Sequence, residues 1–310
     1  MRETDNEVDR GDGRRSCYGV LYGIAAYGSW GIFPLYFKAV ASVPPVEVLA
    51  HRALWSAIML VAIMGVLGRW REFWWKLRSR KLLLLLSLST FFIAVNWLTY
   101  IYAVASGQVL QSSLGYFINP LVNVLFGVLF LRERLRPCQT LSIGLALVGV
   151  FVLTAFMGQV PWLALTLALS FALYALMRKL MSVNGVLSLT AETLVMAPVG
   201  LVYLGCCAAG TSGDTPGFGT IGLLMLSGPI TTVPLLFFGA AARRLRLSTL
   251  GILHYLSPTL QFLLAVLAFG EPFSAAQLLS FACIWAAVLL YAFDSLRAVR
   301  PSPVPVFEPD

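Results

Sequence analysis

The segment 109–131 carries polar side chains along one face of an otherwise apolar run. Ser112, Tyr116, Asn119 and Asn123 stand four, three and four residues apart, so a helix places them on one side. Amides and hydroxyls in that pattern either line a water-filled pathway for a solute or hydrogen-bond a neighbouring helix. We expect the first role, a substrate pathway, for Tyr116, Asn119 and Asn123.

Three further segments carry polar groups and prolines at similar depth. Pro120, Pro234 and Pro258 each lack a backbone N–H and clash with the preceding helical turn, so we predict that they break their helices near mid-membrane. We predict one central cavity bounded by these segments. Its remaining pathway residues are Asn96, Trp97, Tyr100, Thr232, His254 and Tyr255.

Ionisable residues inside apolar segments form a second candidate set. Glu47 and His51 are four residues apart and share a helix face. Because histidine titrates near neutral pH, the pair suits proton sensing or substrate gating, while an ion pair that anchors the helix is the alternative. The predicted gating or proton-coupling residues are Lys38, Glu47, His51, Arg52, Lys179 and Glu192.

Glu192 stands alone in the apolar segment 186–209. An isolated carboxylate in a membrane needs a cationic partner from another helix, and Arg178 and Lys179 are the candidates. A structural pair between helices is the interpretation we favour over a gate.

Cysteines and histidines form no recognisable catalytic or metal-binding pattern. The chain has five cysteines without a CxxC motif and two histidines without an HExxH motif, so no zinc set can be assembled. A GxxxxGK[ST] motif for ATP is also missing from the sequence. We therefore expect no metal, no cofactor and no enzyme activity.

Composition places the chain in a lipid bilayer. Apolar residues make up 59% and charged residues 12% of 310 positions, against roughly 45–50% and about 25% in soluble domains. This balance excludes a soluble enzyme, a nucleic-acid partner and a disordered chain.

Ten apolar segments are long enough to cross the hydrocarbon core as helices. All lysines and arginines except Lys38 and Arg52 fall on one side when the segments alternate in direction, which predicts an inner-membrane, multi-pass protein with both termini in the cytoplasm. Residues 1–16 are expected to be a frayed cytoplasmic tail without a cleaved signal peptide, and residues 296–310 a second tail. The expected spans are 18–37, 46–67, 82–104, 109–131, 140–157, 160–177, 186–209, 219–242, 247–269 and 274–293.

An internal repeat relates the two halves. A shift of 138 residues aligns Pro120 with Pro258, and likewise Glu133 with Glu271 and Gln139 with Gln277. We predict an all-α fold of two five-helix repeats, 17–157 and 160–295. Because five is odd, the second repeat enters the membrane inverted, the architecture of secondary transporters.

Several stretches resemble a known family. Residues 113–121 read SLGYFINPL, residues 231–235 TTVPL and residues 244–251 RLRLSTLG, together with Asn96-Trp97 and Glu47 before His51-Arg52. With the ten-helix plan, they are similar to the EamA domain of the drug/metabolite transporter superfamily, most closely to its RarD group, labelled for chloramphenicol sensitivity. A departure is His254, where the group has glutamine before the tyrosine.

The resemblance implies an inner-membrane permease for a small organic metabolite or drug. Export by alternating access, with proton coupling, is our working hypothesis, and a membrane sensor or accessory subunit without transport activity is the alternative. The expected partners are the lipid bilayer and a small-molecule substrate. Substrate identity, transport direction, coupling ion and oligomeric state stay open.

Overall fold

The computed structural model is an all-α bundle of membrane-spanning length. It describes residues 2–131, 137–158, 160–181, 183, 185–210, 217–242, 244–245 and 253–298. Within these ranges every regular element is a helix, which confirms the all-α, polytopic membrane fold.

The helices follow one another with short connections. Their bounds are α1 Arg2–Ala39, α2 Pro45–Val66, α3 Trp70–Lys76, α4 Arg80–Ala105, α5 Val109–Leu131, α6 Pro137–Met157, α7 Trp162–Leu180, α8 Gly185–Gly210, α9 Phe218–Ala242, α11 Leu256–Leu263, the π-helical turn η1 Leu264–Ala268, and α12 Ala275–Ala298.

These bounds lie close to the expected spans. By length and composition, the described parts of six helices (α1, α2, α4, α6, α8 and α9) are apolar enough to cross a membrane, and those of α7, α11 with η1, and α12 are shorter apolar helices. The count of ten spans stays a prediction. The first part of the expected span 247–269, up to residue 252, lies outside the described residues. Residues 2–16 continue α1 as a helix, so the expectation of a frayed segment there is wrong.

Helix ends follow from local sequence. Pro45 occupies the first turn of α2, where a missing N–H costs nothing. The Ser79 hydroxyl accepts a hydrogen bond from the Leu82 N–H at the start of α4. Gly107 ends α4 with φ of 67°, a left-handed conformation that favours glycine and lets α5 begin two residues later.

Two of the three predicted helix breaks are absent. α5 continues through Pro120, and α9 continues through Pro229 and Pro234, so the prediction that Pro120 and Pro234 break their helices is wrong. A proline ring removes one hydrogen bond, but the neighbouring helices can hold the remaining turns in place. The third break is present but lies three residues before Pro258, since a turn at Tyr255 precedes α11 and Pro258 lies in the first turn of that helix.

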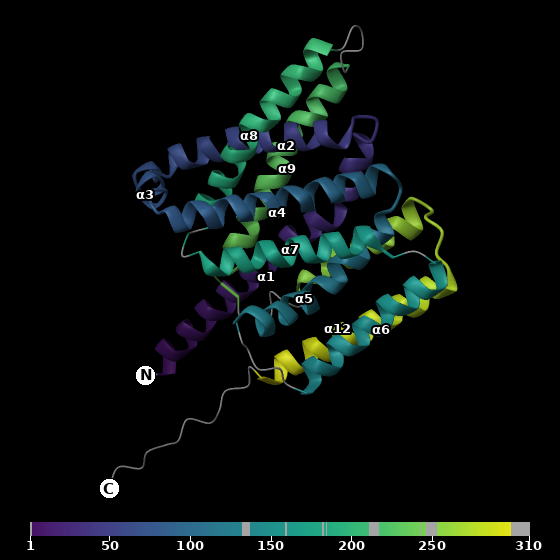
Figure 1. Ribbon diagram of the computed structural model, residues 1–310. Coiled ribbons are helices and arrows are strands. Elements are labelled where there is room, and N and C mark those ends of the chain that lie inside the picture. Colours follow the sequence, from purple (N-terminus) through teal and green to yellow (C-terminus); the bar gives the residue numbers. More distant parts are fainter. Residues whose placement is uncertain are drawn as a thin grey trace.

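The most extensive helix interfaces join the first half of the chain to the second. α2 packs on α8 and α6 packs on α12, which lie side by side at one edge of the bundle (Figure 1). α1 packs on α9 and on α11. In the equivalent way, α7 packs on α4 and on α5. Each of these interfaces joins a helix before residue 158 to one after it, so the core forms between the halves.

Glycine permits the closest of these crossings. A Cβ on Gly115 of α5 would lie 2.7 Å from the backbone oxygen of Ala164 in α7. A Cβ on Gly228 of α9 would lie 2.7 Å from the backbone oxygen of Trp55 in α2. Small residues at helix crossings are the usual means of close packing in a bilayer.

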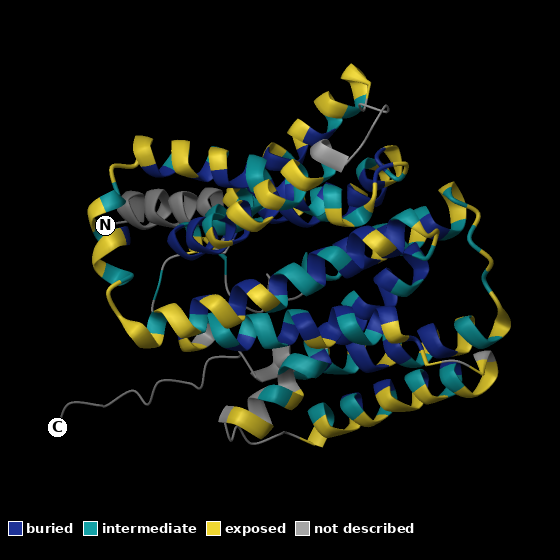
Figure 2. Ribbon diagram, turned by 45° about the horizontal axis from the view of Figure 1, so that its top comes forward, coloured by how far each residue is buried: buried dark blue, intermediate teal, exposed yellow. Residues whose placement is uncertain are grey.

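Large apolar side chains cover the outside of the bundle. Phe151 of α6 and Leu289 of α12 are 72% and 69% exposed, and Val202 of α8 is 68% exposed. Figure 2 shows exposed positions along the outward faces of the helices and buried positions along their inward faces. On helices long and apolar enough to cross a membrane, such faces are typical of lipid contact, and the chain is a multi-pass membrane protein in contact with the bilayer.

Candidate functional site

Asn119 carries an unpartnered amide in the middle of the bundle. It is 1% exposed, and its Nδ2 has no hydrogen-bond partner in the part of the chain that the structure describes. Its Oδ1 accepts one long bond of 3.5 Å from Asn123 Nδ2. Ser112 donates to the Val109 carbonyl in its own helix at 2.7 Å, so it is satisfied locally. The stripe on α5 therefore contains one buried donor that is free to bind a solute.

Asn96 has a different environment. Its Nδ2 donates to the Leu167 carbonyl at 3.0 Å and to Ser170 Oγ at 3.1 Å, both on α7. The amide thus joins α4 to α7, the alternative role that we considered for such stripes.

Three predicted pathway residues of the second half also have buried polar atoms that make no hydrogen bond to a described residue. These atoms are Thr232 Oγ1, His254 Nε2 and Tyr255 Oη. The His254 ring lies edge-on to Tyr27 of α1, and the Tyr255 ring stacks on Phe117 of α5 at 6.4 Å between centroids. Both contacts bring the second half against helices of the first.

Arg52, one of the predicted gating or proton-coupling residues, lies inside the bundle. It is 5% exposed, and its Nε donates to Thr231 Oγ1 of α9 at 2.8 Å. Its guanidinium lies 4.0 Å from the ring centroid of Trp97 and 5.5 Å from that of Phe37. Trp97 and Tyr100, two predicted pathway residues of α4, are buried in the same region. The Tyr100 ring lies against that of Tyr116 of α5, with 5.8 Å between the ring centroids.

Glu47 and His51 do not form a hydrogen bond or an ion pair with each other. Both are half-buried, and the His51 Nδ1 atom has no hydrogen-bond partner among the residues described. Their charges still interact electrostatically along the helix face that they share. The structure therefore separates Arg52, which faces the aromatic interior, from this pair.

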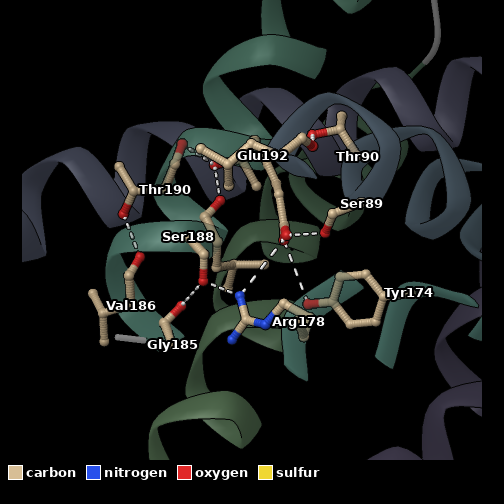
Figure 3. Close-up of polar contacts among 12 residues, drawn as sticks. Ser89, Thr90, Tyr174, Arg178, Gly185, Val186, Ser188, Thr190 and Glu192 are labelled. Atoms are coloured by element: carbon tan, nitrogen blue, oxygen red, sulfur yellow. Dashed lines mark hydrogen bonds and ion pairs between the residues drawn. The ribbon is translucent and has the colours of Figure 1, made fainter. Parts of the chain in front are cut away.

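Glu192 has the partner that an isolated carboxylate requires. It is 1% exposed on α8, and its Oε1 lies 3.8 Å from Arg178 Nη1, one of the two candidates from the sequence. Ser89 of α4 donates to Oε1, and Tyr174 of α7 donates to Oε2 at 3.4 Å (Figure 3). The carboxylate joins three helices from both halves of the chain. The side chain of Lys179 lies outside the described part.

Glu271 joins the halves at the opposite ends of these helices. Its carboxylate oxygens accept hydrogen bonds from the backbone N–H groups of Val109 and Leu110, at 2.6 and 2.8 Å, and so cap α5. Lys38 contributes a favourable charge interaction nearby. Burial nevertheless raises the pKa of the Glu271 carboxyl above its ordinary value, outweighing both N–H donors and Lys38.

Sequence reasoning did not assign this cap. The repeat pairs Glu271 with Glu133, but the spacing of residues does not tell which helix end a connecting loop meets. The signal that could have found it is the Gly-Glu-Pro run at 270–272, where Gly270 turns the chain with φ of 63° directly before the acid. The acid is then placed next to the start of α5.

A small pocket opens away from the predicted pathway. Its volume is about 70 Å³, and Gln108, Gln111, Trp162 and Gln277 contribute to its lining. It contains none of the predicted pathway residues. Among the described residues, no three His, Cys, Asp or Glu side chains gather as metal ligands.

Comparison with known proteins identifies the family. The profile of the EamA-like transporter family matches residues 17–155. Protein RarD of Salmonella typhimurium is 44% identical over 291 residues, which cover 93% of this chain and 99% of that protein. The chain belongs to the EamA-like transporter family. An uncharacterized transporter of Pseudomonas aeruginosa is 43% identical over 93% of this chain and 97% of its own, and protein RarD of Escherichia coli is 42% identical over 93% and 98%.

A solved structure shows the same fold at greater distance. A protein crystal structure superposes on this EamA-family chain with a TM-score of 0.61 at 20% identity, covering 90% of this chain and 99% of that one. With the RarD relatives, the family assignment confirms that the chain is a RarD-like membrane transporter. The site residues are assigned no role by these likenesses.

Proposed function

We propose that this EamA-family chain is a secondary transporter that exports a small organic metabolite or drug across the cytoplasmic membrane by alternating access. The observation that carries the proposal is a set of buried polar atoms, from both halves, that have no hydrogen-bond partner among the described residues. Asn119 Nδ2 belongs to α5, Thr232 Oγ1 to α9, and Tyr255 Oη to the turn before α11. An unpaired polar group costs free energy in a bilayer, so such groups persist where a solute or water pairs them.

The packing between the halves supports this mechanism. Helix interfaces recur in the same form when the helices of 17–157 are exchanged with those of 160–295, as α1 on α9 and α7 on α4 illustrate. Two inverted repeats with this exchange can rock against each other and open a central site to either side in turn. The buried state of Asn119 and Thr232 corresponds to a closed stage of that cycle.

The two carboxylates that join the halves suit the role of gates. Glu192 holds α8 to α4 and α7 at the end that we expect to face the cytoplasm, and Glu271 holds the second half to the start of α5 at the other end. Opening either side separates the helices that the corresponding carboxylate joins. Proton coupling through Glu192 or through His51 belongs to the same proposal.

An untargeted comparison of metabolites tests the transport function. Cells that express the chain and cells that lack it are compared for the metabolites inside and outside. We expect at least one small organic compound to fall inside and rise outside with expression. Asn119→Ala should remove this difference at equal membrane abundance, and Leu125→Ala, at a more exposed apolar position of the same helix, should keep it. A sensor or accessory subunit would leave all compounds unchanged.

A further inference from the structure

Arg52 is a buried cation without an acidic partner among the described residues. Every ion pair described for the chain involves other side chains, and Arg52 has only one hydrogen bond, from Nε to Thr231 Oγ1 at 2.8 Å. Both terminal nitrogens, Nη1 and Nη2, make no hydrogen bond to a described residue. A guanidinium presents these two nitrogens as a planar fork, the geometry that binds a carboxylate through two bonds.

Aromatic rings hold the guanidinium in place but do not neutralise it. The rings of Trp97, Phe37 and Phe33 have their centroids at 4.0, 5.5 and 5.9 Å from the guanidinium carbon. Ring faces attract a cation through their quadrupole, which offsets only part of the cost of removing a charge from water. The cluster therefore keeps a net positive charge in a low-dielectric region.

Nearby hydroxyls add hydrogen-bond donors to this charge. The titratable groups that interact electrostatically with Arg52 are the phenols of Tyr36, Tyr100 and Tyr116. The Tyr36 hydroxyl donates to the Leu223 carbonyl at 2.9 Å, whereas the Tyr100 hydroxyl is buried and has no partner within the described ranges. The positive charge of Arg52 and the free Tyr100 hydroxyl together are complementary to an anionic ligand.

The cluster also lies where substrate would be expected under the proposed function. Arg52 belongs to α2, Trp97 and Tyr100 to α4, and Thr231 to α9, so helices of both halves meet at it. Thr231 is next to Thr232 in the chain, and Tyr116 lies one helical turn before Asn119. Thr232 and Asn119 are the predicted pathway residues whose buried polar atoms have no partner among the described residues.

We propose that Arg52 binds the carboxylate of the transported compound, which is a small monocarboxylate with an apolar or aromatic body. The inference rests on the proposed transport function and names its substrate class. A single charge balances a single carboxylate, which favours a monocarboxylate over a phosphate ester with two charges. The rings of Trp97 and Phe37 offer contact to the apolar body beside the charge.

Thermal unfolding of the purified full-length protein in detergent tests the proposal. The probes are a panel of small aromatic and aliphatic monocarboxylates, each paired with its uncharged primary amide. We expect some carboxylates to raise the unfolding midpoint by about 3 °C at a tenfold excess over their dissociation constant, and their amides to leave it unchanged. Arg52→Gln should lose this rise, and Arg52→Lys should keep a smaller part of it because the charge remains without the fork.

Arg71→Gln is the matched control, because it removes the same charge from an exposed position of α3 and should keep the full rise. Equal rises with carboxylates and amides, no rise with any member of the panel, or an unchanged rise in Arg52→Gln would each overturn the proposal. The comparison of acids with amides needs only the wild-type protein, so it decides the matter even if Arg52→Gln does not fold.

Failure of this inference is distinguishable from failure of the proposed function. If expression redistributes only neutral or cationic metabolites, transport stands and the carboxylate site is wrong. If no metabolite is redistributed, the transport function itself is wrong.

Discussion

Substituting Asn119 by alanine separates a transport role from a packing role more sharply than any other change in α5. The side chain is buried, yet its Nδ2 donates to no described group and its Oδ1 accepts a single bond of 3.5 Å. If the amide exists to bind a solute, its removal should lower transport strongly while the folded protein stays intact.

The expected change in stability follows from a comparison with Asn96. Asn96 donates two bonds to α7, and interhelical hydrogen bonds in membranes average about 0.6 kcal/mol, so Asn96→Ala should cost about 1 kcal/mol of stability. Asn119→Ala loses at most one weak bond and relieves an unpaired donor, so its stability change should be below about 0.5 kcal/mol. Loss of one substrate hydrogen bond of about 1.5 kcal/mol should lower flux roughly tenfold.

Both quantities can be measured on the same preparations. Unfolding in mixed micelles gives stability, and flux of a redistributed metabolite in inverted membrane vesicles gives transport, with Leu125→Ala as the control for a generic change in α5. Near-normal flux in Asn119→Ala, or a stability loss as large as that of Asn96→Ala, would refute the assignment of Asn119 to the pathway and leave Glu47 and His51 as the better site.

Four further predictions concern gates, packing and topology. Glu192→Gln should lower the free energy of unfolding by about 1–3 kcal/mol because it breaks a buried charge network, and unchanged stability in micelles would contradict this. Gly115→Ala should cost about 1–3 kcal/mol, because its Cβ meets the Ala164 backbone oxygen at 2.7 Å, and an unaltered unfolding midpoint would argue against the close crossing. Burial raises the pKa of the Glu271 carboxyl, so this group's contribution to stability is complete below its unfolded pKa and is lost as pH rises through its folded pKa. Glu271→Gln should therefore reduce the fall of the unfolding midpoint between pH 4 and 7. Parallel curves of midpoint against pH for the wild type and the variant would count against this prediction. Reporters fused within 69–81 should behave as cytoplasmic markers, and an outside signal would overturn the proposed inverted repeat.

Local sequence predicted the helices well because a bilayer imposes their length and apolarity. Runs of about 20 apolar residues, ended by residues such as Gly107 or begun by Pro45, are sufficient to place a span within a few residues. The need of Glu192 for a cation was equally predictable, since Arg178 is one of two cations shortly before it in the chain.

Contacts between distant helices were harder to predict from the sequence. Spacing placed Arg52 beside Glu47 and His51, but whether it points to headgroups or to Trp97 depends on how α2 rotates against α4, which no periodicity in α2 records. Pro120 was expected to break α5, but the neighbouring helices keep the remaining turns in place. The Asn119 amide, whose Nδ2 has no partner among the described residues, and the Asn96 amide, whose Nδ2 donates to α7, look alike in sequence and differ in what the neighbouring helices offer them.

The pairing of α2 with α8 and of α6 with α12 has a consequence for synthesis of the chain. Ala50 of α2 is covered by Gly200, and Gly149 of α6 is covered by Ser280, so each face meets its partner more than a hundred residues later. At about 5–20 residues per second, the ribosome needs roughly 7 to 30 s to deliver those partners. Throughout that interval the nascent first half stands in the membrane with its future interior against lipid or the insertion machinery, and it acquires its final neighbours only when the second half arrives.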